Sequence, residues 1–222
     1  MRPYRHARSS AGASRPWTDD LAVHEFMDAT KFACADRRHR IVLHHVDLGA
    51  EIVAWAFPAR TDAVELVRSH VREDLGHHVR LADWFEHVDV ERLPVPIARR
   101  VRGGTDGLAS LVCSGLPSTD PQIVREVCRF LFRPCAFVNG EPLRALPVLM
   151  NAAGPMIVRH VFGPPREAAD GTVVDHALIA EAAIHTAFGR ISDLHEVVRC
   201  VTGEPVARRD ADASMKRRDD DA

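Results

Sequence analysis

Apolar residues recur at helical spacing along most of the chain, and few segments alternate between apolar and polar residues as a strand does. This pattern predicts a mainly α-helical protein. In the N-terminal part we expect helices over residues 21–35, 36–57 and 62–75, followed by a short helix that contains residues 81–88. Thr18, Asp19 and Asp20 are candidate N-caps for the first of these helices. Pro58 is suited to end the second helix, and Gly76 is suited to cap the third.

The predicted helix over residues 36–57 has one apolar stripe, formed by Ile41, Leu48, Ile52 and Trp55. A helix of a globular protein buries such a stripe against its neighbours. Leu48 and Trp55 are therefore predicted to belong to the core. His44 lies at one edge of the stripe and His45 at the opposite edge.

Glycines indicate a boundary between two parts of the chain, because Gly103, Gly104 and Gly107 lie close together and glycine is unfavourable inside a helix. The tail has mixed charge and almost no large apolar residues, a composition typical of disorder. We predict an N-terminal arm (1–20), a helical half (21–101), a linker (102–120), a second helical half (121–205) and a disordered tail (206–222).

The second half resembles the first in three segments that occur in the same order. VHEFMDATKFACA (23–35) aligns with VREVCRFLFRPCA (124–136), GAEIVAWAFP (49–58) with GPMIVRHVFG (154–163), and RLADWFEHV (80–88) with RISDLHEVV (190–198). The offset grows slowly, as short loop insertions would produce, and this favours a bundle built from two similar helical halves, although amphipathic helices alone can produce weak repeats. In this alignment the apolar residues Leu149, Met150, Ala180 and Ile184 replace His44, His45, His70 and Asp74.

Histidines and carboxylates concentrate in the first half, where eight of the 13 histidines lie between His24 and His87. Several of them have an acidic residue one helical turn away: His24 with Asp28, His44 with Asp47 and Glu51, and His70 with Glu73 and Asp74. Residues at this spacing share a helix face, and an imidazole beside a carboxylate suits a divalent metal ion or a proton transfer. The predicted ligands of one divalent metal ion are His44, His70, Asp74 and His24.

Two function classes remain open for this cluster. In the first, the protein is a metal-dependent hydrolase of the HD-like kind, acting on a phosphate-containing substrate that Arg38 and Arg40 bind. In the second, the chain is a non-catalytic helical module that binds a protein partner. His45 is then a hydrogen-bonded core histidine, and the two arginines belong to a solvated, salt-bridged surface.

Composition sets modest limits on the partners. With 46% apolar and 27% charged residues the chain is typical of a globular protein, and its net charge of -2 argues against a nucleic-acid partner. No apolar segment approaches the length of a membrane span. The five cysteines include no closely spaced pair, so we expect reduced thiols in a cytoplasmic protein. A homo-oligomer is compatible with all of this.

Four phrases in the first half resemble the family of uncharacterised bacterial and prophage proteins known as DUF6915: PYRHARSS, VHEFMDATK, RHRIVLHH and HVREDLGHHVRLADW. The matching positions are Tyr4, His6, Ser9, Ser10, His24, Asp28, Lys31, Arg38, His39, Arg40, His44, His45, His70, Glu73, Asp74, Gly76, Asp83 and Trp84. The chain departs from the family pattern at Met27, where a second aromatic residue is usual, and lacks a glycine-rich stretch after HARSS. The resemblance covers about residues 3–88 and implies a structural unit with a site, but no reaction.

Overall fold

The computed structural model describes residues 2–12, 16–34, 37–85, 101, 103–139, 142–167, 171–189, 191 and 194, and it describes no side chain at 37, 38 and 142. The predicted tail over residues 206–222 lies outside these ranges. The described part is mainly α-helical, as predicted, and its only sheet is a two-stranded hairpin.

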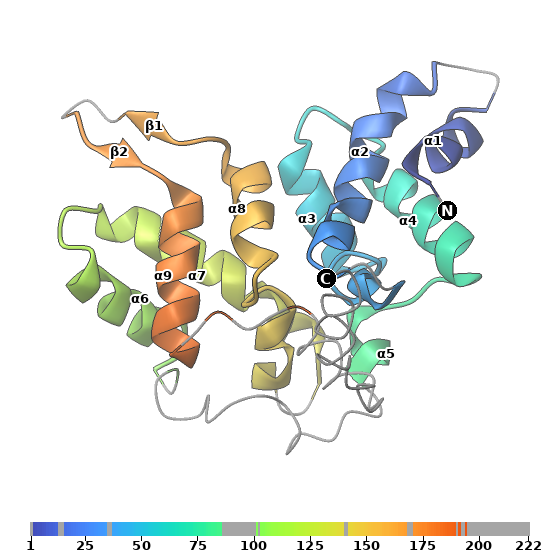
Figure 1. The fold of residues 1–222 in the computed structure, drawn as a ribbon. Helices are drawn as coiled ribbons and strands as arrows, with labels where there is room; N and C mark the ends of the chain where they lie inside the picture. The colour runs from blue at the N-terminus through green and yellow to red at the C-terminus, as the bar shows by residue number, and fades with distance from the viewer. Residues whose placement is uncertain are drawn as a thin grey trace, which may run out of the picture.

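The first half consists of short helices: α1 (Pro3–Ala11), α2 (Thr18–Asp28), η1 (Ala29–Phe32), η2 (Arg37–Ile41), α3 (Leu48–Ala56), α4 (Ala63–Leu75) and α5 (Leu81–Phe85). Helices α1, α2 and α4 pack against one another, and α3 packs against α4 (Figure 1). The helix predicted over 62–75 agrees closely with α4, which ends at Gly76 in the left-handed conformation with φ of 81°.

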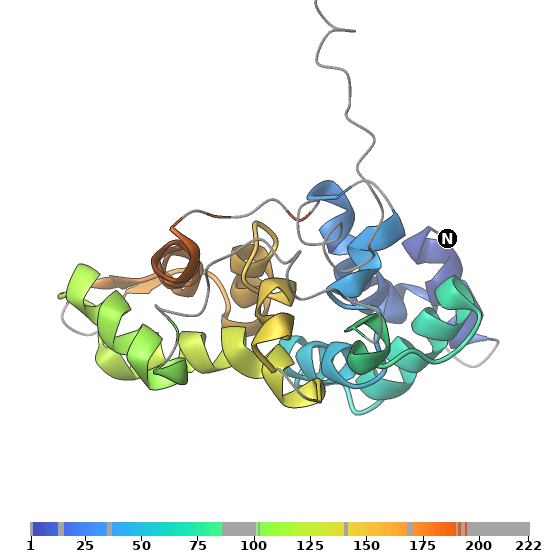
Figure 2. The ribbon, with the colours of Figure 1, turned by 90° about the horizontal axis from the view of Figure 1, so that it is seen from below.

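The second half consists of α6 (Gly104–Gly115), α7 (Pro121–Phe132), η5 (Arg133–Phe137), η6 (Pro142–Val148), α8 (Gly154–Phe162), β1 (Arg166–Glu167), β2 (Val173–Val174) and α9 (His176–Phe188). Strands β1 and β2 are antiparallel, with Arg166 opposite Val174. Helix α9 packs against α6, α7 and α8. Figure 2 shows the two halves side by side, with η6 and α8 of the second half next to the first half.

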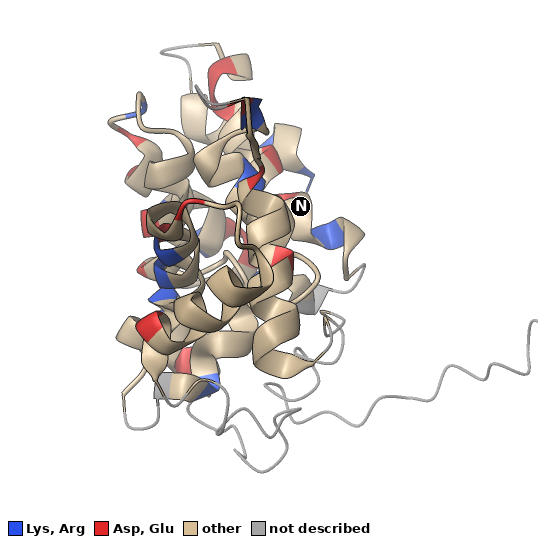
Figure 3. Cartoon of the chain, turned by 90° about the vertical axis from the view of Figure 1, so that its left-hand side faces the viewer, with Lys and Arg blue, Asp and Glu red and all other residues tan. Residues whose placement is uncertain are grey.

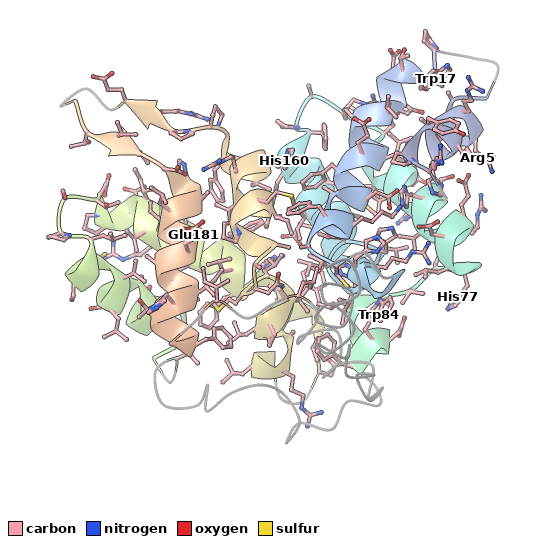
Figure 4. The ribbon with its side chains drawn as sticks, in the orientation of Figure 1. Arg5, Trp17, His77, Trp84, His160 and Glu181 are labelled. Carbon is pink, nitrogen blue, oxygen red and sulfur yellow. The ribbon has the colours of Figure 1, made fainter. Side chains whose placement is uncertain are left out.

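One hydrophobic core runs through both halves. At the junction, the ring of Phe26 from α2 meets the ring of His160 from α8 edge to face, with centroids 4.9 Å apart. Figure 4 shows His160 on the side of α8 that faces the first half. Arg133 of η5 donates two hydrogen bonds, of 2.5 and 2.8 Å, to the carboxylate of Glu51 on α3. The halves are therefore joined by apolar packing and by an ion pair.

The helix predicted over residues 36–57 is wrong as a continuous element, because the chain turns between η2 and α3. The imidazole of His45 causes this turn: its Nδ1 accepts a hydrogen bond of 2.7 Å from the backbone of Gly49, and its Nε2 donates one of 3.1 Å to the carbonyl of Ile41. Asp47 then caps α3, since its carboxylate accepts from the backbone N–H groups of Leu48 and Leu81.

Leu48 is fully buried, as predicted, whereas the prediction for Trp55 is wrong. Trp55 lies near the C-terminal end of α3 and is 40% exposed. It stands at the edge of a cavity of about 640 Å³ between the halves, where its ring lies 5.7 Å from that of Phe130. The apolar stripe therefore extends beyond the core at this end of the helix.

The segments predicted as an N-terminal arm and as a linker each contain a helix. Helix α1 lies within the predicted arm over residues 1–20, and α6 lies within the predicted linker over residues 102–120. Gly104 and Gly107 are tolerated because they fall in the first turn of α6, while Leu108 and Val112 bury the rest of that helix.

The two halves share the same order of main elements, but whether they superpose stays a prediction. Within the described residues each half runs through two helices, two 3₁₀ segments and two further helices; the short helix α5 is an addition of the first half, and the hairpin β1–β2 is an addition of the second. Gly49 and Gly154 have similar surroundings. A Cβ added at Gly49 would lie 2.1 Å from the carbonyl oxygen of Leu43, and one added at Gly154 would lie 1.9 Å from that of Leu149. Gly76 and Gly189 each cap a 13-residue helix.

Charged residues do not form a single patch on the face shown in Figure 3, where basic and acidic segments are interspersed along the helices. Among the described residues, no helix combines the length and the apolar character that crossing a bilayer requires.

Candidate metal centre

Four side chains of the first half point at one another: Asp28, His44, His70 and Asp74. Asp28 is the last residue of α2, and His44 lies in the turn between η2 and α3. His70 and Asp74 are one turn apart on α4, so they share a face. One ligand atom from each of the four lies within 4.8 Å of all the others.

Five of the six separations among these atoms are close to those of ligands around a single small cation. The Nε2 atoms of His44 and His70 are 3.1 Å apart. Asp28 Oδ1 lies 3.7 and 3.8 Å from these two nitrogens, and Asp74 Oδ2 lies 3.3 and 3.7 Å from them. Zinc bonds of roughly 2.0–2.2 Å in tetrahedral geometry place ligand atoms about 3.3–3.6 Å apart. Four protein ligands of this kind would complete a tetrahedral site.

The group is buried, so its charges interact strongly. Both histidines are 0% exposed and Asp28 is 4% exposed, while the Asp74 side chain is 1% exposed. Burial alone would raise the pKa of the Asp28 carboxyl, but contacts from His39, His44, His70 and Lys31 lower it well below its usual range. The pKa of Asp74 is lowered in the same way, because contacts from His44 and His6 outweigh burial. Both carboxylates are therefore ionised.

The neighbouring imidazoles are neutral for a different reason. Burial lowers the pKa of His70 to about 3, with contributions from His44 and His6. Burial also lowers the pKa of His24 to about 4, helped by His6. Ionised carboxylates and neutral imidazoles are the protonation states that metal ligands require.

Further charged and polar groups surround the four residues. Lys31 Nζ lies 2.5 Å from Asp28 Oδ2, and Arg40 Nη2 lies 2.9 Å from Asp74 Oδ2. His6 of α1 stacks on the ring of His70 with centroids 4.0 Å apart. The Nδ1 of His6 donates a 2.6 Å hydrogen bond to Glu73, and its Nε2 lies 3.3 Å from Asp74 Oδ1.

Asp28 Oδ1 and His44 Nδ1 are buried atoms of the group for which the described part of the chain shows no partner at normal hydrogen-bond distance. Buried polar atoms are satisfied in most native structures, and an exception often marks the place of an ion or a water molecule. Asp28 Oδ1 is the carboxylate oxygen that faces His44 and His70. This atom is therefore the strongest single indication of a cation at the centre of the group.

The structure brings His44, His70 and Asp74 together, and it places His24 beside them. His24 Nδ1 lies 2.8 Å from His70 Nδ1, on the side of that ring that faces away from the other three residues. Arg40 contacts Asp74, whereas the side chain of Arg38 lies outside the described residues. The metal and substrate roles of these residues stay predictions.

Sequence reasoning did not select Asp28, His6 or His39 as site residues. Helical spacing pairs Asp28 only with His24, because it shows which residues share a face but not which faces meet in the fold. His6 comes from the segment predicted to be an arm. All three residues are nevertheless among the positions that carry the family resemblance, so the shared phrases held the missing signal.

The geometry describes a helical unit with a buried histidine–carboxylate group, and a comparison with protein families agrees with its extent. Residues 1–93 match the family described as Domain of unknown function (DUF6915), the family that the four phrases resemble. A search of the curated proteins and of the solved structures found no match.

Proposed function

We propose that the first half of the chain is a metal-binding domain in which Asp28, His44, His70 and Asp74 hold one divalent cation. The observation that carries this proposal is the convergence of four ligand atoms, two of them from buried carboxylates, with the unsatisfied Asp28 Oδ1 facing the middle of the group. Two imidazoles and two carboxylates suit zinc, iron or manganese.

The proposed site is closed. Four protein ligands fill a tetrahedral zinc site, whereas catalytic zinc sites keep one position for water or substrate. The ligand residues are buried, and α1 packs against both α2 and α4 beside them. These features favour a site that stabilises the fold, and they support a non-catalytic role more strongly than hydrolysis.

The test is the metal content of the purified full chain. We expect about one zinc, iron or manganese ion per chain, bound tightly enough to survive dialysis, and its loss in a His44→Ala, His70→Ala double variant. The matched control is a His77→Ala, His78→Ala double variant, which removes two exposed histidines just after α4. A wild-type protein without stoichiometric metal after reconstitution, or equal loss in the control, would contradict the proposal.

An HD-like hydrolase acting on a phosphate-containing substrate is the second candidate, and one observation favours it. The guanidinium of Arg40 lies beside Asp74, and its buried Nε has no hydrogen-bond partner within the described residues. A phosphate oxygen would be a suitable acceptor for this donor. We expect metal-dependent hydrolysis of a nitrophenyl phosphate ester that Arg40→Ala abolishes and Arg72→Ala, an exposed arginine on α4, preserves. Absence of turnover in the metal-loaded protein would exclude the hydrolase and would not contradict the metal-binding proposal.

A further inference from the structure

His70 is held from behind by a chain of hydrogen bonds that runs away from the proposed metal. Its Nδ1 lies 2.8 Å from Nδ1 of His24, whose Nε2 lies 3.1 Å from the hydroxyl of Ser10. That hydroxyl donates to Asp20 Oδ2 at 2.8 Å. The chain therefore links three elements, α4, α2 and α1, through side chains that are distant in the sequence.

Asp20 lies at the far end of this series of hydrogen bonds, and an ion pair with Arg60 fixes its position. Asp20 is fully buried, and its Oδ1 accepts a 2.8 Å hydrogen bond from Arg60 Nη2. Arg60 also pairs with both oxygens of Asp62 and donates to the backbone carbonyl of Asp19. A carboxylate paired with a guanidinium is ionised and can only accept hydrogen bonds. Asp20 is thus a fixed acceptor at one end.

The fixed acceptor determines which atom carries the hydrogen in each of these hydrogen bonds. The hydroxyl of Ser10 has a single hydrogen, and two acceptors lie near it: Asp20 Oδ2 at 2.8 Å and the carbonyl of Ala7 at 3.2 Å. The shorter contact, with an ionised carboxylate, takes the hydrogen, so the contact with His24 requires that Nε2 of His24 donates. When neutral His24 is protonated at Nε2, its Nδ1 is unprotonated and must accept a hydrogen bond from His70. When neutral His70 donates this hydrogen bond from Nδ1, its Nε2 is unprotonated. The lone pair of that atom faces His44, Asp28 and Asp74.

We infer that Ser10 and His24 are positioning residues that hold His70 in the tautomer whose Nε2 is free to bind a metal ion. His24 is not a ligand in this arrangement, since both its nitrogens are already used. Ligand histidines commonly donate their second ring N–H to an outer partner, which fixes the tautomer and the ring orientation. Here the partner is a second histidine, and the anchor is buried Asp20, which pairs with the partly exposed Arg60.

This inference rests on the proposed metal-binding function, but its first test does not require metal. Isotope-labelled histidine distinguishes the two neutral tautomers by the shifts of the ring nitrogens. In the metal-free full chain we expect a single Nδ1-protonated form of His70. In Ser10→Ala a mixture or the opposite tautomer should appear, whereas Ser10→Thr, which keeps the hydroxyl, should restore the wild-type signal. An unchanged His70 signal in Ser10→Ala would overturn the inference.

The second test measures the affinity for Zn²⁺ added to the same metal-free proteins. Ser10→Ala should bind Zn²⁺ roughly 10–100-fold more weakly than wild type, and Ser10→Thr and the exposed-site control Ser9→Ala should match wild type. His24→Gln should retain partial binding, because an amide oxygen can still accept from His70, whereas His70→Gln should lose it. Equal affinity of Ser10→Ala and wild type would reject the positioning role alone. A wild-type protein that binds no Zn²⁺ but shows the expected tautomers would reject only the metal-binding proposal.

Discussion

The Nε2 atoms of His44 and His70 lie 3.1 Å apart, although the residues are separated by 26 positions and come from a turn and a helix. Two imidazole nitrogens at this distance share one proton in a hydrogen bond, unless a cation replaces that proton. Carboxylate oxygens of Asp28 and Asp74 lie 3.3 to 3.8 Å from these two nitrogens. The pair is therefore the centre of the site.

Gly49 should not tolerate a side chain. A Cβ at this position would lie 2.1 Å from the carbonyl oxygen of Leu43, so Gly49→Ala should lower the free energy of unfolding by about 1–3 kcal/mol, as overpacking does. Gly154→Ala should behave alike, since its Cβ would lie 1.9 Å from the carbonyl oxygen of Leu149. Chemical denaturation measures both effects. Gly107→Ala is the control: nothing lies within 4 Å of its added Cβ, so a gain of about 0.5–1 kcal/mol is expected.

Leu48 and Trp55 should respond differently to substitution, although both lie on α3. Leu48 is fully buried, so Leu48→Ala should lower the free energy of unfolding by about 2–5 kcal/mol. Trp55 is 40% exposed, so Trp55→Leu, which keeps an apolar group at the junction, should change it by about 1 kcal/mol or less. A larger loss for Trp55→Leu than for Leu48→Ala in urea denaturation would show that the junction is the main source of stability.

The turn around His45 should weaken in acid. Burial lowers the pKa of His45 to about 4, although nearby Asp47 opposes this effect, so the unfolded chain takes up a proton at a higher pH than the folded chain does. Stability is thus fully present above the unfolded pKa of about 6.5 and is lost as the pH falls towards 4. The slope is at most about 1.4 kcal/mol per pH unit for this residue.

His45→Gln tests the assignment, because an amide can make both hydrogen bonds of His45 but does not titrate. We expect the free energy of unfolding of this variant, measured in a metal chelator, to depend less steeply on pH than that of wild type. His24 and His70 are also buried and neutral, so part of the dependence should remain in the variant. Parallel pH profiles for the two proteins would assign the acid sensitivity elsewhere.

The duplication makes a prediction that superposition of the two halves checks. Residues 18–76 and 121–189 should superpose in the same helix order, with Gly49 on Gly154 and Gly76 on Gly189, because each pair has the same local environment. Pairing Gly76 with Gly189 aligns α4 with α9 in a register that differs by three residues from the sequence alignment, which pairs His70 with Ala180. Helices that cross at different angles in the two halves would show that the shared order arose by chance.

Local chemistry explains which elements the sequence predicted well. The helix over 62–75 was predictable because its apolar period and its glycine cap act within a few residues. The break before Leu48 was not, because it depends on a side chain bonding to the backbone of Gly49. Helix α6 was hidden by glycines that fall in its first turn.

The site was predictable in part for the same reason. His70 and Asp74 share one helix face, so their proximity follows from spacing alone. Asp28 and His6 join them only through the packing of α1 and α2 on α4, which no single-helix pattern contains. The sequence overestimates the burial of Trp55, because periodicity identifies the apolar face of a helix but not how far along the helix other elements pack on that face.

The stacking of His6 on His70 has a kinetic consequence. Helix α1 packs on α2 and α4, and its His6 ring lies directly over a ligand of the proposed ion. His6 also lies 3.3 Å from Asp74, so α1 contacts two of the proposed ligands, and we expect the rate of metal exchange to follow the rate of a local opening of the N-terminus. A domain of this kind would retain its ion through brief exposure to a stronger chelator, and a cut after Ala11 would remove that protection.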